Sequence, residues 1–216
     1  MKLVLLLLLA LVLQRPAAGP PVVRVALSPL TGAAYRAAAK AAVVTRPALT
    51  FPLKKARGCI VVPTSKGAKV FRDKGVGTDN DDQAQFEYVG YWPQFKCHLL
   101  LGHYWEHSLS LLVPASGEKQ LALYGPPAFS PNGQSFVSIA SGIEYGVYPN
   151  EVRLFRFENG RWRQVWQLEP SVEPATWEPA EIHWLTNSTL LLKKKIWTGP
   201  NPGTTFTYAK LTIHAP

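Results

Sequence analysis

The feature that most restricts the fold is a series of short apolar runs separated by turn residues, which begins at Gly58. The segment 60–67 (IVVPTSKG) is echoed 51 residues later by the segment 111–117 (LLVPASG). A third hairpin is predicted over 152–168, because Asn159-Gly160 lies between two apolar runs and both residues tolerate a positive φ. The segment 206–213 fits a fourth, incomplete copy.

A strand–turn–strand element precedes each later hairpin, over 86–103, 128–140 and 182–197. Each element carries a short turn sequence at its centre: Gln94-Phe95-Lys96, Pro131-Asn132-Gly133 and Thr186-Asn187-Ser188. The complete unit therefore has four strands and recurs at roughly 40–55 residues, a period typical of propeller-type repeats. Apolar runs such as Leu99–Leu101 and Leu190–Leu192 favour sheets that are buried on both faces.

We therefore predict an all-β fold of antiparallel four-stranded repeat units, β-propeller-like, with three to four blades. The units and the leading hairpin, Cys59 to Arg72, make about three and a half blades, whereas closed propellers usually have four or more. Two alternatives stay open. In the first, the region 45–55 supplies the missing strands and closes a four-bladed ring. In the second, the sheets stack without closing a ring.

The first residues have the pattern of a secretory signal peptide. A positive start at Lys2 is followed by the apolar run Leu3–Leu13 and by small residues at 17–19. Eleven residues of helix span about 16 Å, roughly half of a bilayer core, so a transmembrane anchor is not expected. The sequence thus predicts an exported protein, periplasmic or secreted, whose signal peptide covers 1–19.

Residues 20–57 form a basic N-terminal segment in front of a β-repeat domain at 58–216. Thirteen Lys or Arg and the single acid Asp73 lie in residues 1–75, although the whole chain has a net charge of only +9. An Ala-rich stretch from Ala33 to Val44 is compatible with a short helix. The charge either solubilises the segment or gives it a weak contact with anionic surfaces. Nucleic acid is not an expected partner of an exported chain.

The octapeptide 129–136 (FSPNGQSF) resembles the repeat signature of WD40-like β-propellers of the bacterial exported type. That signature places Ser-Pro-Asp/Asn-Gly at the turn between the first two strands of a blade. The similarity extends over about forty residues and is looser in the other two units. The whole chain also resembles exported bacterial proteins. The resemblance implies a fold and a scaffold role, and it transfers no catalytic residues.

The most polar and aromatic stretch is 103–107 (HYWEH). On a strand, four residues span about 13 Å, so His103 and His107 cannot share one zinc ion unless the chain bends sharply. The aromatic and polar side chains of this region either form a ligand-binding surface or are ordinary residues of the core and the sheet edges. Its candidate residues are Tyr91, Trp92, His103, Trp105, Glu106 and His107.

Two acidic groups are weaker candidates. Asp79, Asp81 and Asp82 alternate loosely like a calcium loop but lack its glycine and its distal Glu, which favours a solvated loop. Carboxylates surround Trp177 and could serve glycoside hydrolysis, which requires two acids about 5–10 Å apart. These acids are Glu169, Glu173, Glu178 and Glu181.

The two cysteines, Cys59 and Cys97, either pair in an oxidising compartment or stay as separate buried thiols, and spacing alone leaves both open. No phosphate loop or nucleophile elbow is present, and no cofactor is predicted. We therefore expect a non-catalytic binding or scaffold module for a protein or glycan. The alternative is a carbohydrate-active hydrolase that uses paired carboxylates beside exposed aromatics.

Overall fold

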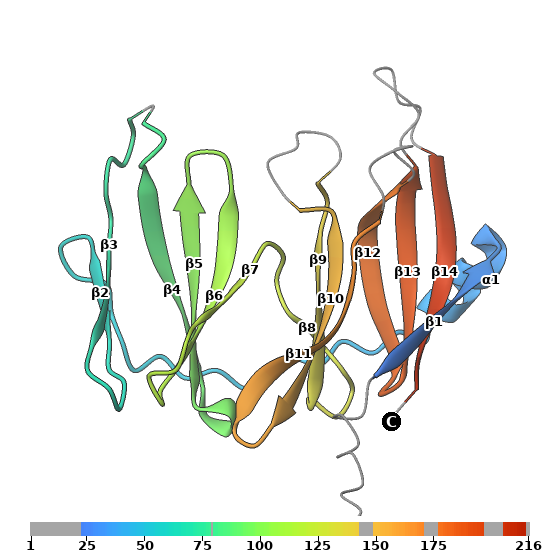
Figure 1. The fold of residues 1–216 in the computed structure, drawn as a ribbon, viewed down its shortest axis with the longest axis horizontal. Helices are drawn as coiled ribbons and strands as arrows, with labels where there is room; N and C mark the ends of the chain where they lie inside the picture. Colours follow the sequence, from blue (N-terminus) through green and yellow to red (C-terminus); the bar gives the residue numbers. More distant parts are fainter. Residues whose placement is uncertain (1–22, 79, 143–148, 171–176, 197–204, 215–216) are drawn as a thin grey trace, which may run out of the picture.

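The computed structural model describes residues 23–78, 80–142, 149–170, 177–196 and 205–214. It confirms the predicted all-β fold of antiparallel four-stranded units. Three four-stranded sheets and one two-stranded hairpin stand side by side in a row, with one short α-helix at the end opposite the hairpin (Figure 1). The predicted leader, residues 1–19, lies outside the described residues.

Unit 1 contains four strands in sequential order. They are β4 (Ala84–Trp92), β5 (Cys97–Tyr104), β6 (Ser108–Pro114) and β7 (Leu121–Leu123). The predicted turn at Gln94-Phe95-Lys96 is a single 3₁₀ turn, η1 (Pro93–Phe95), which ends at Lys96 with a φ of 47°. Pro at the first position suits this turn, because its missing N–H has no partner to lose there.

Unit 2 contains the second set of strands. They are β8 (Ala128–Phe129), β9 (Ser135–Ala140), β10 (Glu151–Glu158) and β11 (Arg161–Leu168). The Asn159-Gly160 hairpin is confirmed, and both residues have a positive φ, 52° and 77°. The Ser-Pro-Asn-Gly turn joins β8 to β9, and its Ser130 Oγ accepts from the N–H of Ser135 at 3.0 Å.

Unit 3 differs from the prediction. It contains β12 (Trp177–Thr186), β13 (Thr189–Ile196) and β14 (Thr205–His214), so the predicted incomplete fourth copy is the third strand of this unit. Its fourth strand is β1 (Arg24–Leu30), which pairs antiparallel with β14 over its whole length. The basic N-terminal segment therefore contributes a strand that the sequence analysis did not predict.

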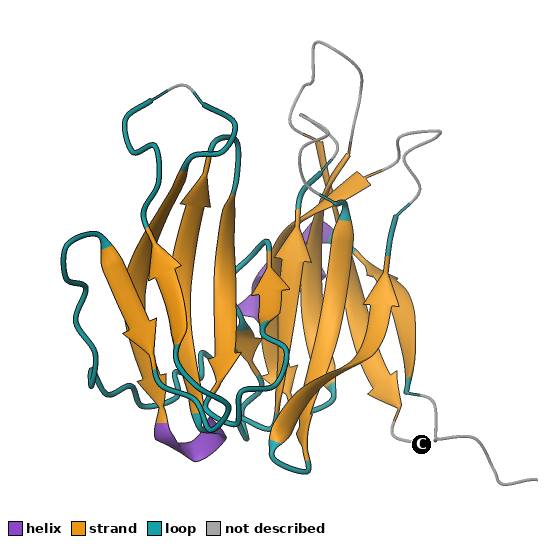
Figure 2. Ribbon diagram, turned by 60° about the vertical axis from the view of Figure 1, so that its left-hand side comes forward, coloured by secondary structure: helices purple, strands orange, loops and turns teal. Residues whose placement is uncertain are grey.

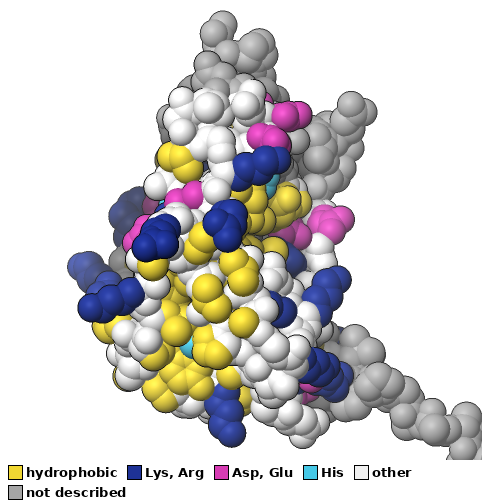
Figure 3. Space-filling view, turned by 90° about the vertical axis from the view of Figure 1, so that its left-hand side faces the viewer, with side chains coloured by type: hydrophobic (Ala, Val, Ile, Leu, Met, Phe, Trp, Pro, Cys, Tyr) yellow, Lys and Arg dark blue, Asp and Glu magenta, His cyan; other side chains and the backbone are white. Residues whose placement is uncertain are grey.

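The two ends of the row are covered differently. The predicted short helix is present as α1 (Gly32–Ala39), which begins after the N-cap Thr31 and packs on unit 3 through the buried ring of Tyr35 against Tyr208. At the other end, β2 (Cys59–Val62) pairs with β3 (Lys69–Arg72) as the predicted leading hairpin. The outer face of this hairpin exposes Val61 and Val70, and Lys and Arg side chains surround apolar ones at this end (Figure 3).

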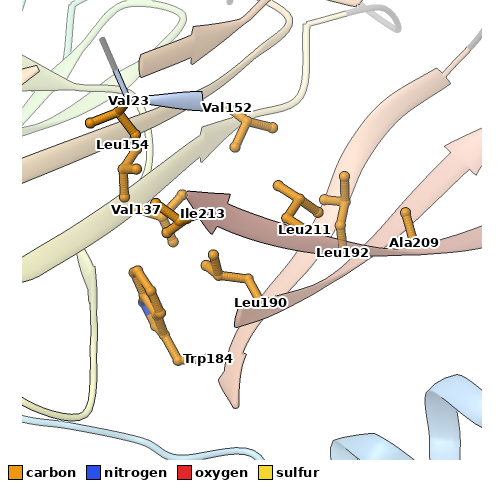
Figure 4. Packing of buried hydrophobic residues seen from close by; sticks show 10 residues of the cluster. All are labelled: Val23, Val137, Val152, Leu154, Trp184, Leu190, Leu192, Ala209, Leu211 and Ile213. Carbon is orange, nitrogen blue, oxygen red and sulfur yellow. The ribbon is translucent and has the colours of Figure 1, made fainter. Parts of the chain in front are cut away.

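Three apolar cores fill the spaces between successive sheets, and the middle strands contribute to two of them at once. Leu112 packs toward unit 2, whereas its neighbours Leu111 and Val113 pack toward the β2–β3 hairpin. Units 2 and 3 are joined by a core that includes Val152, Leu154 and Trp184 (Figure 4). This arrangement explains why the central strands read as continuous apolar runs, since both faces are buried.

Residues 40–58, which we call the strap, cross the sheets from α1 to the β2–β3 hairpin (Figure 1). Figure 2 shows the same sheets from another side. The strap makes single β-bridges to the first strand of each unit: Val43 to Trp184, Thr45 to Phe129, and Thr50 to Tyr91. It adds no sheet of its own, so of the two alternatives the structure shows sheets that stack without closing a ring.

Among the described residues, no helix is both long enough and apolar enough to cross a bilayer.

Candidate ligand-binding groove

A groove opens along the free edge of β4, where the strap moves away from unit 1. The strap is bound to β4 at Thr50, whose N–H donates to the carbonyl of Tyr91 at 2.9 Å. Further along, Lys55 Nζ donates to the carbonyl of Phe86 at 2.8 Å and so attaches the strap to the same strand a second time. Between these two attachments lies a cavity of about 460 Å³. Its walls are Phe51, Leu53, Lys54, Lys55, Gln85, Phe86, Glu87, Tyr88 and His103.

One end of the groove is fixed by an ion pair. Lys55 lies 2.5 Å from Asp73 Oδ2, and Asp73 Oδ1 accepts from the N–H of Phe86 at 2.9 Å. Burial disfavours the ionised form of Asp73, but the hydrogen bonds from Lys55 and Phe86 outweigh it and lower the pKa of this carboxyl. The main-chain groups of Phe86 on the free edge are therefore satisfied by side chains, and an added strand could not use them.

Phe51 is the most unusual side chain of the groove. It stands on the strap between the two attachments and is 68% exposed, although it belongs to a wall with Phe86 and Tyr88. Burial of a side chain of this size stabilises a fold by about 2–3 kcal/mol, so the exposure of Phe51 forgoes that stabilisation. Sequence analysis missed it. The only signal was an aromatic residue in an extended segment directly before Pro52.

The tip of the β5–β6 hairpin brings together some of the predicted ligand-binding residues. The chain reverses at Trp105 and Glu106, so the rings of Tyr104 and His107 stack with centroids 4.8 Å apart. His103 Nδ1 lies 3.0 Å from Ser108 Oγ, and His103 also lines the groove. The segment 103–107 is therefore not one extended strand, because β5 ends at Tyr104 and the chain bends sharply there.

Tyr91 and Trp92 do not join this tip. Gln85 pairs with His103, whereas Tyr91 pairs with His98 at the other end of the same strand pair. Six residues of strand separate the two positions by roughly 20 Å. Trp92 is also buried against Phe95 and Phe129. The six candidate residues therefore do not form one surface, because Tyr91 and Trp92 lie apart from the tip that carries Trp105.

Metal-ligating side chains do not converge within the described ranges, where no group of three or more His, Cys, Asp or Glu could hold an ion. Asp79 lies outside those ranges, and Asp82 forms an ion pair with Lys74.

The acids near Trp177 are held by lysines of the neighbouring strand. Glu178 Oε1 lies 3.1 Å from Lys195 Nζ, and Glu181 Oε1 lies 2.7 Å from Lys193 Nζ, as the β12–β13 register dictates. The hydrogen bond from Lys193 lowers the pKa of Glu181 and outweighs its burial, and His183 adds to the effect. A general acid in a glycosidase needs the opposite shift. Glu173 lies outside the described residues, and Glu169 accepts a hydrogen bond from Gln167.

The two cysteines are separate free thiols, so the disulfide alternative is wrong. Cys97 lies in the core between units 1 and 2. Cys59 lies on β2, on the far side of unit 1, and its neighbour Ile60 packs into a different core. A whole sheet separates the two sulfur atoms, which a disulfide cannot bridge.

No family model matches the chain, and neither the curated proteins nor the solved structures include one that is detectably similar to it.

Proposed function

We propose that this chain is an exported, non-catalytic β-repeat module that binds a protein or glycan ligand in the β4 groove. The groove carries the proposal, because it holds an exposed aromatic side chain, Phe51, beside polar and charged walls. A cavity of about 460 Å³ lies within the size range of ligand sites, which runs from about 300 to 1,000 Å³. Export rests on the signal-peptide pattern of residues 1–19.

A WD40-like relationship is part of the same proposal. The Ser-Pro-Asn-Gly turn lies between the first two strands of unit 2, which is the position that the signature implies. The stacked sheets and their apolar central strands are consistent with it. A scaffold role follows from rigid sheets that present a groove at one edge.

The test replaces Phe51 and compares it with an exposed side chain of the same strap outside the groove. Val44, which is 72% exposed, is the matched control. Purified chain is immobilised, and exported proteins and a glycan array are screened for retention on the wild type, Phe51→Ala and Val44→Ala. We expect a ligand that Val44→Ala retains at wild-type affinity and that Phe51→Ala binds about tenfold more weakly, as for an aromatic anchor.

Equal retention by Phe51→Ala and the wild type would contradict the groove as the binding surface. The same screen separates the two functions, because each retained glycan is recovered and its length is measured. An unchanged glycan supports binding, whereas shortened products support the hydrolase.

A further inference from the structure

A second hollow, which we call the basic cleft, lies between units 1 and 2, beside the β10–β11 turn. Its volume is about 470 Å³, and its lining combines four cations, one acid and one aromatic ring. These residues are Lys66, Lys119, Arg161, Arg163, Glu118 and Trp162. They come from three places in the chain, the β2–β3 turn, the β6–β7 connection and β11, so the fold itself gathers the positive charges.

The positive charge of the cleft is only partly compensated. Glu118 lies 3.8 Å from Arg161, and its main-chain carbonyl accepts from Lys69 Nζ at 3.0 Å. Within the part of the chain that the structure describes, Lys66, Lys119 and Arg163 have no acidic partner. Neighbouring cations repel one another, and a bound anion offsets this repulsion because each cation attracts it.

Trp162 provides a second and independent observation. Its ring is only 9% exposed and is packed by Phe95, Phe136 and Phe157. Its Nε1–H is buried without an acceptor among the described residues. Buried indole N–H groups are normally paired, so this donor is available to an acceptor group of a ligand.

A narrow slot with otherwise mostly apolar walls adjoins the basic cleft at Trp162. The slot and the cleft share Glu118, Lys119, Arg161 and Trp162 as walls, and the slot has a volume of about 30 Å³. A buried water molecule needs about 10–15 Å³ of such space, so a single oxygen atom fits in the slot.

We propose that the basic cleft binds an acidic saccharide, through a carboxylate or sulfate group whose oxygen enters the slot and accepts from Trp162 Nε1–H. Arg161 and Arg163 bind the same group, since a guanidinium fork matches both anions. Lys66 and Lys119 attract the neighbouring charged sugars. This inference goes beyond the proposed function, because it adds a second binding site that shares no residue with the β4 groove.

The lining and the size of the cleft favour a saccharide over a protein. Four of the six residues that line the hollow are cations, whereas the centre of a protein interface is poor in charged residues, lysine above all. A volume of about 470 Å³ is instead within the range for a small ligand or one section of a polymer.

The experiment compares charged and neutral polymers that share a backbone. Calorimetric titrations use dextran sulfate, uncharged dextran, oligogalacturonate, galacturonate monomer and polyglutamate, at low and high salt. The cleft variant is Arg161→Gln/Arg163→Gln. Its control, Lys40→Gln/Arg46→Gln, removes two charges from exposed positions outside the cleft. Trp162→Phe keeps an aromatic side chain but removes the N–H donor together with part of the ring volume, and its unfolding midpoint shows whether it is folded.

We expect the wild type and the control pair to bind dextran sulfate or oligogalacturonate equally, and to ignore dextran. Trp162→Phe should bind about tenfold more weakly, the effect of one lost charge-assisted hydrogen bond, and the cleft pair should weaken binding further because it removes two guanidinium groups. Binding of the monomer assigns the site to a single sugar, and binding of the oligomer alone assigns it to a polymer; either supports the proposal.

Three results would overturn it: no binding of any acidic saccharide at low salt, equal weakening by the control pair, or tighter binding of polyglutamate in the same cleft. Because Phe51 is untouched in every variant, failure here leaves the groove proposal standing, and failure of the Phe51→Ala test leaves this one standing.

Discussion

At the scale of single residues, the two thiols have opposite surroundings. Cys97 is buried between units 1 and 2, and burial raises its pKa from 9.0 to about 12. Cys59 is partly exposed on the β2–β3 hairpin. Thiolates rather than thiols react, so exposure and pKa together decide the chemistry of each sulfur.

We therefore predict that iodoacetamide labels Cys59 in the folded chain and labels Cys97 only after unfolding, as measured by peptide mass spectrometry. The buried thiol also sets a pH dependence. In the unfolded chain Cys97 ionises near 9, whereas in the folded chain it ionises near 12. Its contribution to stability is complete below the lower pKa and is lost as the pH rises toward the higher one. The free energy of unfolding should therefore fall over this interval.

Cys97→Ala is the control for the alkaline effect, because two tyrosines with raised pKa values add to it. Tyr35 and Tyr88 also have pKa values raised to about 12, chiefly by burial. In Cys97→Ala, the free energy of unfolding should still fall at alkaline pH, but by less than in the wild type. A pH profile identical to that of the wild type would show that the thiol does not contribute.

Sequence patterns were least informative about single residues. The register of β4 with β5 places Tyr91 and Trp105 at opposite ends of a strand pair, and the chain reversal between Tyr104 and His107 interrupts the extended segment that was expected over 103–107. Both depend on where a strand ends, which composition does not determine within a few residues.

At the scale of elements, the hairpins were predictable because each has a local cause. Asn159-Gly160 adopts positive φ at both residues, and the apolar runs of the central strands face two cores. β1 was not predictable. Five of its seven residues are exposed, it contains Pro29, and its partner β14 lies almost at the other end of the chain. An edge strand of this kind has no alternation to recognise, and proline is tolerated there. The path of the strap was equally hard to predict, since it contacts each sheet through a single-residue bridge and has no strand pattern of its own.

Two glycines test different constraints within unit 2. A Cβ added at Gly125 would lie 2.2 Å from the carbonyl oxygen of Ile139, whereas at Gly160 it would meet nothing within 4 Å. Gly160 instead has a φ of 77°. We predict that Gly125→Ala forces the β7–β8 connection off β9 and costs about 3 kcal/mol or more, as overpacking can. Gly160→Ala should cost about 1–2 kcal/mol, the strain of a left-handed residue.

Urea unfolding of the two variants measures both values. Gly160→Asn serves as the control, because asparagine accepts a positive φ more readily and should recover part of the loss. If Gly125→Ala were as stable as the wild type, the connection would have to be able to shift without cost.

At the scale of the whole molecule, the row of sheets has one covered end and one open end. α1 covers unit 3, whereas the β2–β3 hairpin leaves Val61 and Val70 exposed, 51% and 56% (Figure 3). Between these ends each sheet contacts only its neighbours, as in other repeat proteins, and the strap is the one segment that bridges to all three units in the described chain. Unit 3 is the exception to local assembly, because its fourth strand comes from the N-terminal part of the chain.

This dependence predicts that unit 3 loses stability selectively when β1 is removed. A chain that begins at Thr31 lacks β1 and also Val23, which is buried in the core between units 2 and 3. The exposed edge of β14 then loses its hydrogen-bonded partner, and the lost burial of Val23 alone amounts to about 1.5–3 kcal/mol. Because nearest-neighbour stacking confines the effect, amide hydrogens of β12–β14 should exchange faster while those of β4–β6 keep their protection.

Hydrogen-exchange mass spectrometry measures each sheet separately, and a peptide of residues 21–30 added in trans provides the decisive control. If the truncated unit lacks only a strand, the peptide should restore protection of β14 first, whereas a scrambled peptide should not. Equal loss of protection in all sheets would mean that the row unfolds as one cooperative body, with the strap coupling the units more strongly than their separate cores imply. Unchanged protection of β14 would mean that β1 adds little to unit 3. The outcome thus decides whether the chain unfolds unit by unit, as a repeat array does, or as a single domain whose three units are coupled by the strap.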